Sequence, residues 1–172
     1  QRDFEREGGV LVPVGTPKTW RAWNWRLRTL SSIPEKVDYL GEHMAYEVLM
    51  LRHTVARMHT SVEQHDWNAF YESFVVHARL LYRFLTSFNE PKDFKATDFE
   101  PSFRTDKKIA PTIDKMHRQV LHAGRRYAEA DKKVNLEDCV RVCGGIEAEF
   151  SRFLHTLKEP YRSARDWNAL PP

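Results

Sequence analysis

Arg118 and His122 stand one helical turn apart, in a segment whose apolar residues recur at helical spacing. Side chains four residues apart on a helix share a face, so this guanidinium and this imidazole could act together. A guanidinium holds phosphate through charge-assisted hydrogen bonds, and a histidine can serve as general acid or base without a metal. Lys115, Arg125 and Arg126 lie beside them and make this the most basic helical face in the sequence. We predict that Lys115, Arg118, Arg125 and Arg126 bind nucleic acid.

Other arrangements that carry chemistry find little support. None of the eight histidines has a glutamate three residues before it, and the sequence contains no His-Glu-x-x-His or Cys-x-x-Cys, so we expect no metal and no other cofactor. Gly-rich phosphate loops and a Gly-x-Ser-x-Gly elbow are also absent from the sequence, which leaves nucleotide-fold and hydrolase-fold chemistry without support. Cys139 and Cys143 are one helical turn apart, which suits a disulfide poorly. We expect reduced core thiols and a cytoplasmic location.

His77 lies in the middle of an apolar helical stripe, which is formed by Phe70, Phe74, Ala78, Leu81, Phe84, Leu85 and Phe88. We interpret His77 as a buried structural residue, with a ring nitrogen bonded to a polar group on a neighbouring helix, such as Tyr46, His117 or a backbone carbonyl. Burial without a partner would cost about 1–3 kcal/mol. The pKa of the His77 imidazole is expected to fall unless its partner is a carboxylate.

The elements that must position these residues are helical. Apolar periodicity, the Ser32/Glu35 capping box and Asn135 as a helix cap predict an all-α fold. The long helices are expected at about 35–62, 67–88, 109–130 and 135–158. Short links make antiparallel packing the natural arrangement of this bundle. The mid-helix pair Gly144-Gly145 predicts a close helix crossing.

Three regions follow from this pattern: an N-terminal arm with a short Trp-rich docking helix at 1–34, the helical bundle at 35–158, and a C-terminal tail at 159–172. Residues 1–16 are read as an arm or a small extended segment. Trp20 and Trp25 lie among arginines, so the short helix either docks its indoles on the bundle or binds nucleic acid by stacking.

A second stripe lines one side of the 35–62 helix, about 130° from its apolar face, and holds Tyr39, His43, Tyr46, Met50, His53 and Arg57. Such a two-faced helix sits between layers or offers one face to a partner. Two interpretations stay open. The stripe is either a polar-aromatic seam against another helix of this chain, or an interaction surface that acts together with Trp20 and Trp25.

The composition bounds the class of partner. The chain has 172 residues, a net charge of +3 and a sequence pI near 8.9, which permits an anionic partner without demanding one. No apolar run approaches the roughly 20 residues that a membrane span needs, so we expect a soluble chain without a membrane partner.

Several blocks carry a resemblance. Four stretches of the chain resemble a group of small, uncharacterised bacterial all-helical proteins. They are A-Y-E-V-L-M-L at 45–51, N-A-F-Y-E-S-F-V-V-H-A-R-L-L-Y-R-F-L at 68–85, D-F at 98–99 and V-L-H at 120–122. The similarity spans about residues 44–157 and is most specific in the E-S-F-x-x-H-A-R block. It implies a helical fold but no activity.

The architecture is also similar to the HEPN superfamily of helical bundles, many of which are metal-independent ribonucleases or toxin components. Their motif is an arginine, a polar residue and then a histidine, with four to six residues between the arginine and the histidine, usually assembled across a dimer. Arg52-His53 followed by His59 has six intervening residues, and Arg118 followed by His122 has three. The resemblance implies Arg52 and His59 as catalytic candidates, and also Arg118 and His122, whose spacing is shorter than in the motif.

Two functions from different classes stay open. The first is a HEPN-like protein that binds RNA or acts on it, including a metal-independent ribonuclease of a defence or toxin system that works as a homodimer. The second is a non-catalytic helical module that docks into a larger protein or nucleoprotein assembly. The sequence alone does not say whether the chain is an enzyme.

Overall fold

The first long helix begins where its capping residues predict. Ser32 Oγ accepts a hydrogen bond from the Glu35 backbone N–H at 3.3 Å, and Pro34 lies in the first turn. The helix expected at 35–62 spans 33–60 and contains a π-helical segment, which the periodicity did not predict. Its three consecutive segments are α2 (Ile33–Asp38), η1 (Tyr39–Met44) and α3 (Ala45–Thr60).

The computed structural model describes residues 4–7, 10–13, 32–86, 93–106, 110–121 and 133–170. Strands β1 (Phe4–Glu7) and β2 (Val10–Pro13) form an antiparallel ribbon, in the region predicted as an arm or small extended segment. In the other described ranges the regular structure is helical, in agreement with the all-α prediction. The expected Trp-rich helix, with Trp20 and Trp25, lies outside the described residues.

The other helices differ from the predicted bounds by a few residues where they are described. They are α4 (Gln64–Thr86), α5 (Ala96–Phe99), α6 (Ala110–Leu121) and α7 (Leu136–Thr156). The expected third helix, at 109–130, is described only through its first 12 residues, and 122–130 lie outside. The structure therefore supports long helices at α2–α3, α4 and α7 and leaves the predicted count of four long helices open.

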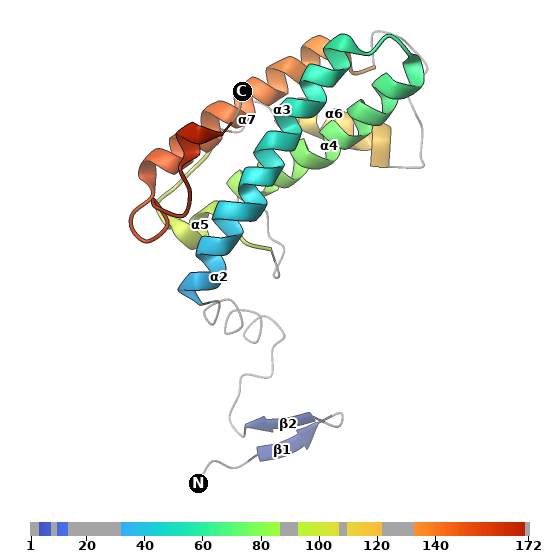
Figure 1. The fold of residues 1–172 in the computed structure, drawn as a ribbon. Helices are drawn as coiled ribbons and strands as arrows, with labels where there is room; N and C mark the ends of the chain where they lie inside the picture. Colours follow the sequence, from blue (N-terminus) through green and yellow to red (C-terminus); the bar gives the residue numbers. More distant parts are fainter. Residues whose placement is uncertain are drawn as a thin grey trace.

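The long helices lie side by side in one elongated body (Figure 1). Helix α3 packs against both α4 and α7, and α4 also contacts α6. The short link between Thr60 and Gln64 makes α3 and α4 antiparallel, as predicted. The space between them is filled by apolar side chains, among which Leu51, Phe74 and Ile146 are fully buried.

An aromatic cluster at one end of the core is centred on Phe153. Its ring is fully buried and lies 5.2 Å from Phe84 and 5.3 Å from Phe103, measured between ring centroids. Phe99 and Phe150 are its next aromatic neighbours. Because Phe99 and Phe103 belong to the 93–106 segment, this long connection packs through its phenylalanines.

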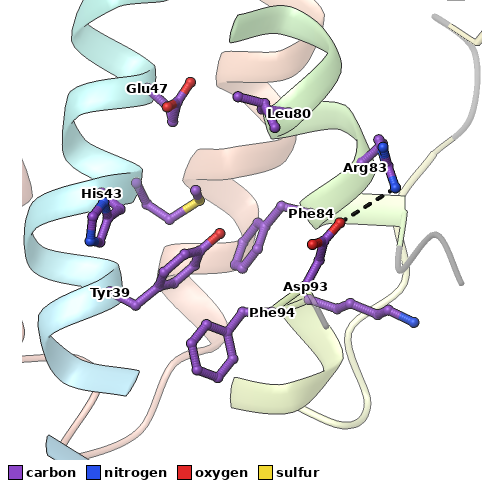
Figure 2. Close-up of a pocket in the computed structure, with 10 residues that line it drawn as sticks. Tyr39, His43, Glu47, Leu80, Arg83, Phe84, Asp93 and Phe94 are labelled. Carbon is purple, nitrogen blue, oxygen red and sulfur yellow. Dashed lines mark hydrogen bonds and ion pairs between the residues drawn. The ribbon is translucent and has the colours of Figure 1, made fainter. Parts of the chain in front are cut away.

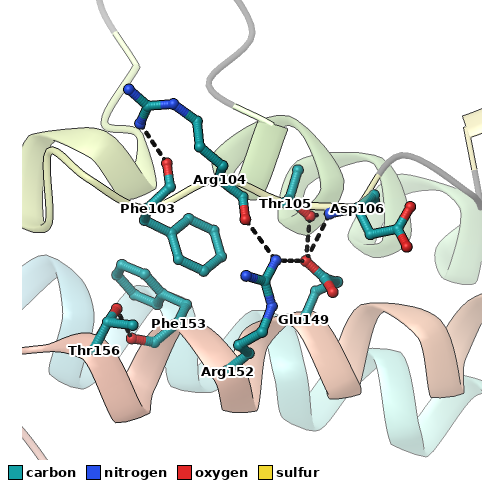
Figure 3. A network of polar contacts seen from close by, with 8 residues as sticks. All are labelled: Phe103, Arg104, Thr105, Asp106, Glu149, Arg152, Phe153 and Thr156. Carbon is teal, nitrogen blue, oxygen red and sulfur yellow. Dashed lines mark hydrogen bonds and ion pairs between the residues drawn. The ribbon is translucent and has the colours of Figure 1, made fainter.

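The same connection is fastened to α7 by a polar network (Figure 3). Glu149 Oε2 accepts hydrogen bonds from Thr105 Oγ1 at 2.6 Å, from the Asp106 N–H at 3.0 Å and from Arg152 Nη2 at 2.5 Å. Burial raises the pKa of the Glu149 carboxyl, but these hydrogen bonds outweigh it and leave the pKa below its ordinary value. The carboxylate therefore stabilises the fold above about pH 4.5, and this contribution disappears as the pH falls through the folded-state pKa.

The C-terminal segment 157–170 folds back over the bundle (Figure 1). Tyr161, Trp167 and Leu170 are partly buried against the core, and a short 3-10 helix, η3 (Trp167–Ala169), precedes the last described residue. Arg165 Nη1 donates a hydrogen bond of 2.9 Å to the Gly41 carbonyl in the π-helical segment. The expected tail is therefore a packed part of the body as far as residue 170.

Glycine is required at Gly41 and not at Gly144. A Cβ added at Gly41 would lie 2.7 Å from the Ala164 carbonyl oxygen, which is backbone and cannot move aside alone. A Cβ added at Gly144 meets nothing within 4 Å, and the residue is exposed. The close crossing predicted for the Gly144-Gly145 pair does not occur at Gly144, and a close approach occurs between η1 and the C-terminal segment.

This difference predicts opposite effects for the same substitution. Gly41→Ala should lower the free energy of unfolding by about 1–3 kcal/mol, because the added methyl displaces the C-terminal segment. Gly144→Ala should raise it by up to about 1 kcal/mol through improved helix propensity. Urea denaturation of both variants measures the two changes in the free energy of unfolding. Equal effects of the two substitutions would contradict the close contact at Gly41.

Candidate functional site

Helices α3 and α4 meet at one buried polar contact, between Glu47 and His77. His77, from the H-A-R block, is 8% exposed, and its Nδ1 lies 2.6 Å from Oε2 of Glu47, from the A-Y-E block. Tyr46 places its ring edge against the same imidazole, 5.8 Å between centroids. His77 is thus buried and bonded to a neighbouring helix, as expected, but its bonding partner is a carboxylate that sequence reasoning did not name.

A pocket of about 330 Å³ opens between η1 with the start of α3, α4 and the 93–106 connection (Figure 2). Tyr39, Phe84 and Phe94 form its aromatic side, and Tyr39 lies 4.7 Å from Phe94 between centroids. Burial, with the nearby charges of Asp93 and Glu47, raises the pKa of Tyr39 to about 12, so its hydroxyl stays protonated at neutral pH. Charges of both signs line this pocket, which gives it no evident preference for an anion or a cation.

A second cavity, of about 420 Å³, lies between α3, α7 and the C-terminal segment. It gathers basic side chains from all three elements: Arg52, His155, Arg162 and Arg165. Two carboxylates, Glu147 and Asp166, also line it. We call this the C-terminal cavity. Its excess of guanidinium groups over carboxylates favours an anionic ligand.

Two of its arginines are held in place by the protein. Arg52 Nε donates to Glu147 Oε1 at 2.5 Å, which fixes the guanidinium across the α3–α7 interface. Arg165 is held by the Gly41 carbonyl. A guanidinium carries five N–H donors, so Arg165 retains donors for a ligand. Asp166 caps η3 by accepting from the Asn168 N–H at 3.1 Å.

Two further basic side chains line the cavity without a described protein partner. Arg162 and His155 are exposed, and neither side chain makes a hydrogen bond or ion pair with another described residue. They extend the basic character of the cavity toward solvent. Val48, Phe150, Leu154 and Trp167 supply the apolar part of its wall. The cavity therefore combines fixed donors, free donors and an apolar surface.

The predicted basic face of α6 is described only in part. Arg118 is exposed, and Lys115 is partly buried with its Nζ donating to the Lys133 carbonyl at 3.1 Å. His122, Arg125 and Arg126 lie outside the described residues. The proposed Arg118/His122 pair therefore remains a prediction.

The other candidate pair, Arg52 and His59, is separated along α3. Arg52 turns toward α7, where it bonds Glu147, while His59 is exposed near the end of α3. Two helical turns separate them, so their side chains lie on one side of α3 but at different levels. The ion pair described for Arg52 is with Glu147 and not with another catalytic candidate. His122 lies outside the described residues, so the convergence of the four candidates remains a prediction.

The second stripe of the 35–62 helix touches α4 through some of its side chains. Tyr39 packs against Phe84, His53 lies 6.3 Å from the Phe70 ring, and the Arg57 guanidinium lies 5.1 Å from the same ring. Tyr39 and Met50 are partly buried, whereas His43, Tyr46, His53 and Arg57 are exposed. The structure therefore leaves both interpretations of the stripe open. Trp20 and Trp25 lie outside the described residues.

Sequence reasoning missed the C-terminal cavity because its parts are far apart in the chain. Arg52 was chosen for its spacing to His59, while Arg162 and Arg165 were left in an unassigned tail. The available signal was the run Tyr161–Trp167, which places two arginines between two aromatic residues. Only the fold shows that this run packs beside Arg52.

The described part of the chain holds two buried thiols and neither a metal-ligating cluster nor a membrane-spanning helix. Cys139 and Cys143 are buried free thiols, and burial raises the pKa of each to about 12, which keeps them protonated and unreactive. No group of three or more metal-ligating side chains occurs there. No helix in these ranges has the length and apolar character needed to cross a membrane.

Comparisons with models of known protein families, with curated proteins and with solved structures found no match to this chain.

Proposed function

We propose that this chain is a HEPN-like helical protein that binds RNA and acts on it without a metal ion. The observation that supports RNA binding is the C-terminal cavity, where Arg52, Arg162 and Arg165 converge from two distant parts of the sequence. Guanidinium groups recognise phosphate oxygens through paired, charge-assisted hydrogen bonds. Proteins bind single-stranded RNA by combining such groups with apolar and aromatic surfaces for the bases.

The catalytic part of the proposal assigns roles to the candidates from the HEPN resemblance. An arginine, Arg52 or Arg118, would hold the scissile phosphate, and a histidine, His59 or His122, would transfer the proton. HEPN-type sites are usually assembled across a dimer, which fits a pair such as Arg52 and His59 that is separated along one chain. A homodimer is therefore part of the proposal.

The test is RNA cleavage in the presence of EDTA. The wild-type protein should cleave a mixture of single-stranded RNAs, and His59→Ala or His122→Ala should reduce the rate by about 100-fold or more, as expected for loss of a general acid or base. Binding is measured in parallel by fluorescence anisotropy. A wild-type protein that binds RNA without cleaving it would remove the catalytic role, and one that does not bind RNA would overturn the whole proposal.

A second candidate function, a non-catalytic interaction module, is favoured by a different observation. Tyr46, Val76 and Leu80 are 54%, 41% and 44% exposed, and they lie on the α3–α4 side of the body near His77. Exposed apolar groups of this kind are typical of protein interfaces. A protein inert toward RNA, whose self-association is lost in Tyr46→Ser/Leu80→Ser on sedimentation analysis, would support this function instead.

A further inference from the structure

We infer that the C-terminal cavity binds one terminal nucleotide through a phosphate monoester, at an RNA end or on a free nucleotide. This inference rests on the proposed RNA binding and specifies which part of the RNA the cavity takes. Its support comes from the charge, the wall and the size of the cavity.

The charge of the cavity suits a phosphate monoester better than an internal phosphodiester. Three guanidinium groups, from Arg52, Arg162 and Arg165, face a space that also contains the carboxylates of Glu147 and Asp166. A phosphate monoester carries about −1.5 to −2 charges at pH 7, against −1 for a phosphodiester, and offers three terminal acceptor oxygens. Arg52 and Arg165 are already held by protein contacts, so less side-chain freedom is lost when they bind an anion.

The wall of the cavity provides a place for a base beside the phosphate. Phe150, Leu154 and Trp167 line it, and the Trp167 ring is held edge-on to Phe150 at 5.4 Å between centroids. The buried Trp167 Nε1–H has no hydrogen-bond partner among the described residues. An unsatisfied buried donor is costly, and a nearby acceptor on a ligand could satisfy it after a small shift of the segment. Ser151 and His155 add polar groups to the same wall.

The size of the cavity points to one nucleotide rather than a strand. Its volume of about 420 Å³ lies near the lower end of the roughly 300–1,000 Å³ typical of small-molecule sites. Proteins that follow a strand along its backbone instead use extended grooves that cover about 4–16 nucleotides per folded unit. A cavity of this size would hold a phosphate and its attached nucleoside, and leave the rest of the RNA outside.

The experiment compares matched RNA octamers by fluorescence anisotropy at fixed salt. One pair carries a 3′ label and either a 5′-phosphate or a 5′-hydroxyl, and the other carries a 5′ label and either a 3′-phosphate or a 3′-hydroxyl. The phosphorylated member of one pair should bind about tenfold tighter or more, because it adds charge-assisted hydrogen bonds. Calorimetry tests whether the cavity also binds a free nucleotide. Its ligands are adenosine 5′-monophosphate, adenosine 3′-monophosphate, adenosine and inorganic phosphate.

Arg162→Ala is the informative variant, because Arg162 has no described partner whose loss would undock the segment. It should remove the preference for the phosphorylated end. Arg141→Ala is the control with the same charge change: Arg141 pairs with Asp138 on an exposed part of α7 and does not line the cavity. It should leave the preference intact.

The outcomes separate this inference from the proposed function. RNA binding that ignores the terminal phosphate in both pairs would overturn the inference and leave RNA binding in place. Binding of adenosine monophosphates without any binding of RNA would support the cavity assignment and overturn the proposed function. Equal losses in Arg162→Ala and Arg141→Ala would assign the effect to overall charge and contradict the inference.

Discussion

Phe153→Ala is expected to lower the free energy of unfolding by about 3–5 kcal/mol, as large-to-small substitutions of core phenylalanines do. The Phe153 side chain is fully buried and has four aromatic neighbours, so its loss leaves a cavity walled by rings from three parts of the chain. Phe84 comes from α4, Phe150 from α7, and Phe99 and Phe103 from the long connection. These rings cannot collapse together without moving whole elements.

Chemical denaturation measured by circular dichroism checks this prediction. Phe153→Leu, which keeps most of the volume, should cost clearly less than Phe153→Ala. Val140→Ala, at a position 42% exposed on the same helix, should change stability by less than about 0.5 kcal/mol. A loss below about 1 kcal/mol for Phe153→Ala would show that this ring does not hold the 93–106 connection against α7.

His77→Leu should lower the free energy of unfolding by about 1–3 kcal/mol. The leucine keeps the volume but leaves the Glu47 carboxylate, whose side chain is only 14% exposed, without the imidazole that lies 2.6 Å away. The loss of stability therefore comes from the unpaired Glu47 carboxylate as much as from the lost hydrogen bond. Any RNA binding or cleavage should fall no further than the loss of folded protein explains.

A double-mutant cycle isolates this pair. Glu47→Leu alone should also destabilise, whereas Glu47→Leu/His77→Leu should lose less than the sum of the two single variants, because both polar groups are then removed together. Additive losses would mean that the two residues do not interact. A stable His77→Leu protein without function would contradict the structural role and make His77 a functional residue.

Local features of this fold were predictable from the sequence, and contacts between distant segments were not. The stripe around His77, the Ser32 cap and the Asn135 cap depend on neighbours within one or two turns, so their residue types and spacing suffice. The π-helical segment at Tyr39–Met44 adds a wide turn without interrupting the helix, and no spacing rule reports it.

The partner of His77 shows why the site was harder to predict than the helices. Tyr46 and His117 were suggested because they are polar residues on predicted neighbouring helices, and Tyr46 does contact the ring. Glu47 lies next to Tyr46 in sequence but about 100° away on the helix, and only the rotation of α3 against α4 decides which of them bonds the imidazole. That rotation depends on the packing of the entire interface.

The return of the C-terminal segment over α3 and α7 links ligand binding to the attachment of that segment. Arg162, Arg165 and Trp167 complete the cavity only when the segment is docked, so a nucleotide should bind the docked form alone. Ligand present at 100 times its Kd would then favour docking by about 2.7 kcal/mol. The same linkage works in reverse: a change at Gly41 that loosens the segment would weaken nucleotide binding without altering a residue of the cavity.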